Sequence, residues 1–164
     1  MGLDMFLWKE VYVGAEYSHR NMNVIIDVTK DGKRMPINTN KVCEIREEAM
    51  YWRKANAIHS WFLENCAAKD PFDNPIDDCR PIEIPLEKLE ELLDICKEVL
   101  EDHSLAKKLL PTLDGFFFGS TEYGEWYFRA IEETINIIEP VIDFMKHMSE
   151  IKDCTWDVIY EASW

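Results

Sequence analysis

Polar and aromatic side chains are concentrated at residues 51–63, in the segment Tyr-Trp-Arg-Lys-Ala-Asn-Ala-Ile-His-Ser-Trp-Phe-Leu. On an α-helix, Trp52, Asn56 and His59 would share one stripe beside an apolar face, with Arg53 roughly 40–60° beyond Asn56. A ring face, an amide, an imidazole and a guanidinium together suit a planar anionic ligand. In the alternative interpretation Trp52 packs in the core, His59 is a hydrogen-bonded histidine at its edge, and Arg53 is solvated.

A second cluster of candidate side chains follows the aromatic run Gly-Phe-Phe-Phe-Gly at residues 115–119. Ser120 or Thr121 can cap the next helix, and Tyr123 adds a ring with a hydroxyl. Backbone N–H groups at a helix start can hold an anion, although Glu122 and Glu125 already complement the helix dipole. Capping and ligand contact are both open roles, and no Gly-Lys-Ser/Thr follows that would make the segment a P-loop.

Common catalytic and metal-binding motifs are absent from the sequence. The four histidines form no His-Glu-x-x-His pair, and there is no Gly-x-Ser-x-Gly segment. The acidic loop at residues 70–78 lacks the ligand spacing, central glycine and terminal glutamate of an EF-hand. The five cysteines are scattered too widely for a zinc finger or a disulfide framework. We therefore expect no metal, no cofactor and reduced thiols.

The charge of the chain limits its partners. Its 164 residues have a formal net charge of −14 and a pI near 4.6. This charge argues against an extended nucleic-acid surface, because Lys and Arg supply most of the affinity for phosphates. The acids form either an ordinary solvated surface or a face that imitates phosphates. With no apolar run near the roughly 20 residues of a membrane span and no signal peptide, we expect a cytoplasmic single domain at residues 1–164, without membrane contact.

The expected strands lie at the two ends of the chain. Residues 5–13 and 22–29 are short and rich in β-branched and aromatic side chains. Residues 30–33 (Lys-Asp-Gly-Lys) suit a tight hairpin turn with positive φ. A third strand at 34–37 or 42–45 would complete an antiparallel meander. The final residues, 156–164, alternate in polarity and are expected to return beside the N-terminal strand.

Three main helices are expected between these strands. The first begins near residue 46 and ends near Cys66, with an apolar stripe of Tyr51, Ala55, Ile58 and Phe62. After a loop at 67–80, the second takes Pro85 as its first residue and is clearly amphipathic. A short helix at 105–110 precedes the third, which starts near Glu122 and has a kink or break at Pro140. The fold class is α+β: a small antiparallel sheet formed by the N-terminal meander and the C-terminal strand, packed against three main helices.

Four segments carry a family resemblance: Met-Gly-Leu-Asp-Met-Phe-Leu at the start, residues 51–59, residues 116–123, and Ala-Ser-Trp at 162–164. The chain resembles a family of small uncharacterised proteins found in bacteriophages and bacteria. By analogy with a phage setting, the resemblance implies a counter-defence role in the host cytoplasm, such as holding a host signalling nucleotide without cleaving it. It also implies a recurrent set of site residues, namely Trp52, Arg53, Asn56, His59, Gly119, Ser120, Thr121, Tyr123 and Trp164.

Three functions remain open at this point. The first is a non-catalytic binding protein with a pocket between the first helix and the turn at 116–123, for a small planar anion such as a nucleotide. Trp52 or Tyr123 would stack, Arg53 would bind phosphate or carboxylate, and hydrogen bonds would come from Asn56, His59, Ser120 and Thr121. The second is an acidic inhibitor or nucleic-acid mimic that blocks a basic site on a host protein through the helix at 87–101. The third is a small hydrolase or transferase with His59 as general base, its orienting acid not identifiable from the sequence.

Overall fold

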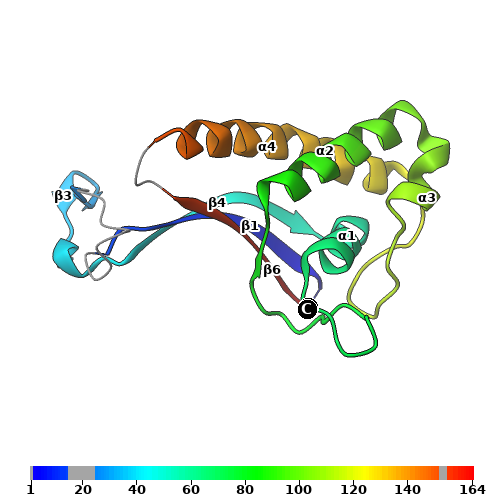
Figure 1. Cartoon of the computed structure of the whole chain (residues 1–164), viewed down its shortest axis with the longest axis horizontal. Coiled ribbons are helices and arrows are strands. Elements are labelled where there is room, and N and C mark those ends of the chain that lie inside the picture. Colours follow the sequence, from blue (N-terminus) through cyan, green and yellow to red (C-terminus); the bar gives the residue numbers. More distant parts are fainter. Residues whose placement is uncertain (1, 15–24, 152–154) are drawn as a thin grey trace.

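A four-stranded antiparallel sheet with helices across one face forms the body of the protein (Figure 1). The computed structural model describes residues 2–14, 25–151 and 155–164. The strand order is β4 (Glu44–Arg53), β1 (Asp4–Tyr12), β6 (Trp156–Ser163) and β5 (Ile82–Glu83). The predicted α+β class, with the terminal strands in one antiparallel sheet, is confirmed.

β1 lies inside the sheet, between two partner strands, and the burial of its side chains alternates along it. Met5 and Leu7 are fully buried, whereas Phe6 and Trp8 point to the opposite face and are partly exposed. β1 pairs with β4 on one side and with β6 on the other, so all its backbone groups have neighbours. A bulge at Leu7/Trp8 shifts the register with β4. The predicted pairing of the two ends of the chain is confirmed.

The helices cover one face of the sheet, and the hydrophobic core lies between the helices and this face. Helices α2 (Leu86–Glu101) and α4 (Glu125–Ser149) pack against each other above the strands (Figure 1). α1 (Asn56–Cys66) is shorter and almost entirely buried along its first two turns. The shortest helices, η1 (Thr39–Lys41), η2 (His103–Leu105) and α3 (Ala106–Leu109), lie in the connections. Among the described residues, no helix is both long and apolar enough to cross a membrane.

The start of the first helix was predicted wrongly. Residues 46–53, expected to be helical, belong to β4, and α1 begins only at Asn56. Pairing with β1 places Trp52 opposite Met5, where both side chains are buried. Ladder hydrogen bonds and the burial of a β-prone aromatic residue outweigh the helical spacing of the apolar residues. Lys54, with a φ of 60°, makes the bend between the strand and the helix.

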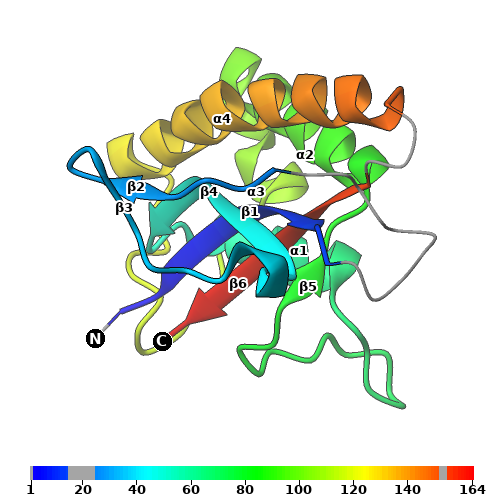
Figure 2. The same ribbon diagram turned by 90° about the vertical axis from the view of Figure 1, so that its left-hand side faces the viewer.

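The hairpin turn was predicted correctly, but the meander was not. Asp31 (φ 52°) and Gly32 (φ 73°) connect β2 (Thr29–Lys30) to β3 (Lys33–Arg34). These two strands, labelled in Figure 2, form a separate sheet of their own, which Figure 1 shows at one end of the molecule, away from the main sheet. The predicted strand at 22–29 is reduced to β2, since 25–28 are not in a strand and 22–24 lie outside the described residues. Of the two positions expected for a third strand, 34–37 overlaps only the end of β3, and 42–45 overlaps only the first residues of β4.

The later helices agree closely with the sequence. Pro85 was predicted to be the first residue of this helix; it is instead the N-cap, immediately before α2 begins at Leu86. The loop at 67–80 and the short α3 before Pro111 are present as expected. α4 begins at Glu125 rather than Glu122 and continues through Pro140 without a break. Trp164 folds back into the body, with its ring 5.7 Å from that of His59 and 5.8 Å from that of Phe118.

Candidate functional site

Trp52 is a core residue that fastens the sheet to α4. Its side chain is 3% exposed, and its Nε1 donates a hydrogen bond to Oγ1 of Thr134 at 2.8 Å. The Thr134 hydroxyl in turn donates to the carbonyl of Ala130, one turn earlier in α4. A ring enclosed in this way has no free face for stacking on a ligand. Arg53, the next residue of β4, points to the opposite face of the sheet.

Asn56 connects the first turn of α1 to the aromatic turn after α3. Its Nδ2 donates to the carbonyls of Phe118 at 3.1 Å and Ser120 at 2.8 Å. Its Oδ1 accepts from the backbone N–H of Leu113 at 3.3 Å. The side chain is 3% exposed, so it holds the turn at 113–120 against α1 rather than facing a ligand. A pocket was expected between these two segments; here they lie side by side and are joined by the hydrogen bonds of Asn56.

His59 lies between the C-terminal strand and the loop that follows α1. Its Nδ1 is 2.7 Å from the hydroxyl of Tyr160, and its Nε2 is 3.3 Å from Oδ2 of Asp77. Because a carboxylate only accepts, Nε2 carries the proton and Nδ1 accepts from Tyr160. Burial lowers the pKa of His59, while the Asp77 carboxylate acts in the opposite direction. Burial also raises the pKa of Tyr160 well above its usual range, so its hydroxyl remains a donor.

Asp77 is the orienting acid that the sequence could not identify for a general base at position 59. The arrangement nevertheless favours a structural role for His59, which is 0% exposed. Both ring nitrogens already have partners within the protein, and a general base needs one nitrogen within reach of the proton it removes. The three side chains therefore tie the loop at 67–81 to β6.

Two adjacent cations, Arg53 and Lys54, lie at the corner where β4 ends. Arg53 is 60% exposed along its side chain, and its Nε is 3.8 Å from Oδ1 of Asp4. Lys54 is exposed and has no ion pair within the described part of the chain. Its side chain lies against two glycines: a Cβ built at Gly2 would be 3.1 Å from its Cε, and one at Gly119 would be 3.0 Å from its Cβ. The N-terminus, the end of β4 and the aromatic turn therefore meet at this corner.

Ser120 and Thr121 extend the same corner with exposed hydroxyl groups. The Oγ of Ser120 accepts from the backbone N–H of Glu122 at 3.1 Å, which leaves its own proton available. The carbonyl of Thr121 accepts from the Thr112 hydroxyl. Neither residue caps α4, whose N-cap is Gly124 and has no side-chain cap bond. Capping, one of the two roles considered for these residues, is therefore not their role in this helix.

Tyr123 is only partly exposed and is engaged by its neighbours. Its hydroxyl accepts from the backbone N–H of Thr112 at 3.3 Å, and its ring packs edge-on to that of Tyr127 at 4.9 Å. The most exposed aromatic residue of the segment is Phe116, at 96%. Phe116 and Lys54 were not among the predicted site residues, because no spacing signal separates either from its neighbours. Lys54 and Gly119 both have positive φ, a backbone conformation that only the fold reveals.

The described residues contain no cluster of three or more His, Cys, Asp or Glu side chains arranged for a metal ion. Cys43, Cys66, Cys79 and Cys96 are free thiols, and Cys154 lies outside the described residues. Asp70, in the acidic loop considered for calcium, accepts hydrogen bonds from the backbone and side chain of Asn74 and from the backbone of Phe72. The Asp70 carboxylate therefore stabilises the turn of its own loop.

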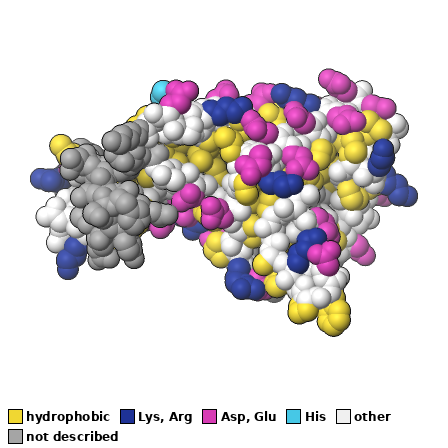
Figure 3. All heavy atoms as spheres, in the orientation of Figure 1, with side chains coloured by type: hydrophobic (Ala, Val, Ile, Leu, Met, Phe, Trp, Pro, Cys, Tyr) yellow, Lys and Arg dark blue, Asp and Glu magenta, His cyan; other side chains and the backbone are white. Residues whose placement is uncertain are grey.

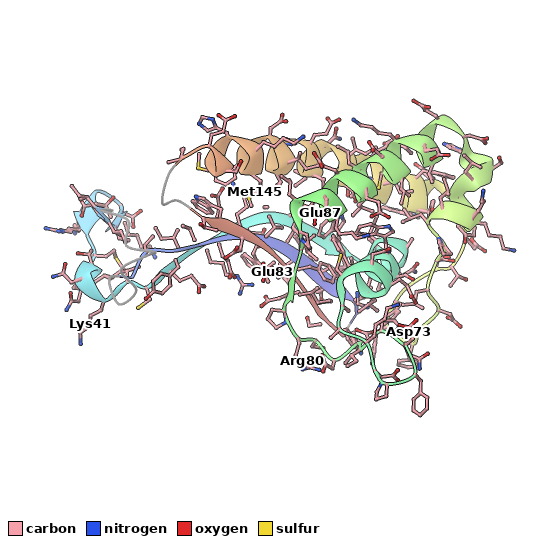
Figure 4. The ribbon with its side chains drawn as sticks, in the orientation of Figure 1. Lys41, Asp73, Arg80, Glu83, Glu87 and Met145 are labelled. Atoms are coloured by element: carbon pink, nitrogen blue, oxygen red, sulfur yellow. The ribbon has the colours of Figure 1, made fainter. Side chains whose placement is uncertain are left out.

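The acidic surface of α2 and α4 is interleaved with lysine and arginine. Lys97 pairs with Glu139 and Lys146 with Glu90, so two ion pairs connect the helices. Figure 3 shows basic and acidic side chains interspersed along these helices. Figure 4 shows Glu87 at the start of α2, where its charge complements the helix dipole. Interspersed cations weaken any resemblance to a row of phosphates.

No protein-family model, no curated protein and no solved structure matches this chain. Its function is therefore argued from the geometry of its own residues.

Proposed function

We propose that the protein binds a small planar anion, such as a nucleotide, at the corner formed by Arg53, Lys54 and the turn at 116–121. The observation that carries the proposal is the pair of adjacent exposed cations beside exposed hydroxyl groups, in a chain whose net charge is −14. An unpaired lysine is a ready partner for phosphate or carboxylate, and an arginine adds two-point hydrogen bonding. Ser120 and Thr121 supply further donors.

The ligand's planar part would lie on Phe116 in this proposal. The Phe116 ring packs edge-on to that of Phe117 at 4.8 Å and leaves its outer surface to solvent. The carbonyl of Phe117 accepts from the backbone N–H of Leu3 at 3.0 Å, which fixes the turn to the N-terminal strand. An exposed ring on a fixed turn whose Gly119 lies against Lys54 suits a base or another aromatic ring system.

The other predicted site residues support this corner from within. Asn56 positions the carbonyl of Ser120, Trp52 anchors the end of β4, and His59 packs edge-on to Phe118 at 5.2 Å. Binding without turnover agrees with the bonding of both His59 nitrogens inside the protein. The biological role that we propose is sequestration of a host signalling nucleotide.

Calorimetry with nucleoside monophosphates, cyclic dinucleotides and inorganic phosphate tests the proposal. Arg53→Ala should weaken binding by roughly 1.5–3 kcal/mol, the value of a hydrogen bond to a charged group. Lys54→Met removes the charge but keeps the methylene groups that contact Gly119, so it should weaken binding without unfolding the protein.

Lys107→Met is the matched control, because Lys107 is exposed on α3, an element separate from this corner. It should leave ligand affinity unchanged. Retained affinity in both Arg53→Ala and Lys54→Met would remove the basis of the proposal, as would unfolding by Arg53→Ala, which would make Arg53 part of a structural network.

A further inference from the structure

The face of the main sheet opposite the helices carries an aromatic row. Tyr51, Phe6 and Trp8 follow one another across β4 and β1, with ring centroids 5.1 Å apart for Phe6–Tyr51 and 5.4 Å apart for Phe6–Trp8. Tyr51 is 45% exposed, and the other two are partly exposed. Figure 1 shows α2 and α4 on the other side of these strands. We call the surface formed by these rings and their outward-facing neighbours the open face.

Carboxylates surround this aromatic row. The strand register places seven acids and two arginines on the open face, a formal charge of −5. Figure 4 shows one of them, Glu83, on β5. The acids are Asp4, Glu10, Glu44, Glu48, Glu83, Asp157 and Glu161, and the arginines are Arg46 and Arg53.

Arg46 shows how a guanidinium is held on this surface. Its guanidinium carbon is 4.4 Å from the centroid of the Trp8 ring. Its Nη2 is 2.9 Å from Glu161, and its Nε pairs with Glu10. Trp8 Nε1 donates to the same Glu161 at 3.0 Å, which fixes both the ring and the carboxylate. An aromatic face flanked by carboxylates combines cation–π attraction with charge-assisted hydrogen bonds.

Part of the open face has no cation of its own. Within the described part of the chain, Glu44, Glu48 and Asp157 have no ion pair, and Glu48 and Asp157 lie on either side of Trp8 and Glu10 in the strand register. We propose that the open face binds an arginine-containing basic segment of another protein, whose guanidinium groups lie on the exposed rings beside these carboxylates. The sign of the charge favours such a segment over single-stranded nucleic acid, which also stacks on open aromatic sheets but carries phosphates.

A short fluorescein-labelled peptide in which arginine alternates with serine is the probe, with binding read by fluorescence anisotropy. The variant Glu48→Gln/Asp157→Asn removes two unpaired carboxylates and preserves side-chain shape. It should weaken binding about three- to tenfold, the range for two partly exposed ion pairs. Tyr51→Thr should also weaken binding, since it removes the exposed ring and keeps a β-prone residue in the strand.

Glu98→Gln/Glu132→Gln is the matched control, because it changes the net charge equally on the exposed surface of α2 and α4. Affinity within about twofold of the wild type is expected for this control, since its charges are remote from the rings. Circular dichroism confirms that each variant is folded. The proposal is overturned by equal weakening in the two double variants, by no binding of the arginine peptide at low salt, or by tighter binding of an oligothymidine strand than of the peptide.

Discussion

Asn56→Ala removes the side chain that joins α1 to the aromatic turn. Asn56 makes three hydrogen bonds, to the carbonyls of Phe118 and Ser120 and from the N–H of Leu113. At about 0.5–1.5 kcal/mol each, their loss lowers the free energy of unfolding by about 1.5–4.5 kcal/mol. For a domain of this size, a central value of about 3 kcal/mol corresponds to a fall in Tm of about 6–12 °C.

Asn56→Asp sharpens this prediction, because it preserves the shape of the side chain but replaces the Nδ2 donor of two hydrogen bonds with an acceptor. The ionised carboxylate would face the carbonyl oxygens of Phe118 and Ser120, which are acceptors too. The loss of stability at neutral pH should therefore exceed that of Asn56→Ala. It should diminish at acidic pH, where the protonated carboxyl group can donate again.

Urea denaturation followed by circular dichroism measures both variants. Asn65→Ala serves as the control on the same helix, since Asn65 is exposed and makes a single bond to the carbonyl of Trp61. It should cost at most about 1 kcal/mol. A loss for Asn56→Ala no larger than that of the control would refute the conclusion that Asn56 holds the turn in place.

Three further outcomes are expected. Burial lowers the pKa of His59, so the unfolded chain takes up a proton first as the pH falls below about 6.5. Stability should then decrease with falling pH, by at most about 1.4 kcal/mol per pH unit from this group, and His59→Gln should show a shallower slope in denaturation curves from about pH 7 to 5. Gly119→Ala should cost about 1–3 kcal/mol in chemical denaturation, because φ is 92° and the new Cβ would meet Lys54 at 3.0 Å; an unchanged midpoint would contradict this. Burial raises the pKa of Cys96 to about 12, so iodoacetamide should modify exposed Cys43 and spare Cys96 until the protein unfolds, as peptide mass mapping can check.

Local sequence patterns predicted the elements whose stability is largely local. The Asp31-Gly32 turn and the amphipathic α2 needed only turn chemistry and helical periodicity. The pairing of the C-terminal strand with β1 followed from alternation at both ends. The assignment failed at Trp52, where aromatic residues are compatible with either state and the partner strand decides.

The candidate site was predicted only in part, because its contacts join residues that are far apart in the sequence. Sequence separation hides the fact that Asn56 and Ser120 are bonded and that Asp77 meets His59. It also hides which side of β4 each residue faces, because moving one residue along a strand reverses the face. Trp52 and Arg53 were therefore grouped on one surface, although the strand separates them.

The position of β6 between β1 and β5 has a consequence for biosynthesis. Trp8 and its hydrogen-bonding partner Glu161 are 153 residues apart in the sequence. At about 5–20 residues per second, β1 is made roughly 8–30 s before β6 exists to pair with it. Until then β1 can pair on the β4 side alone, so the backbone N–H and C=O groups of its other edge stay open to other chains. Long-range pairing of this kind makes folding slow relative to helical proteins, so this edge of β1 is exposed to aggregation until β6 has been made.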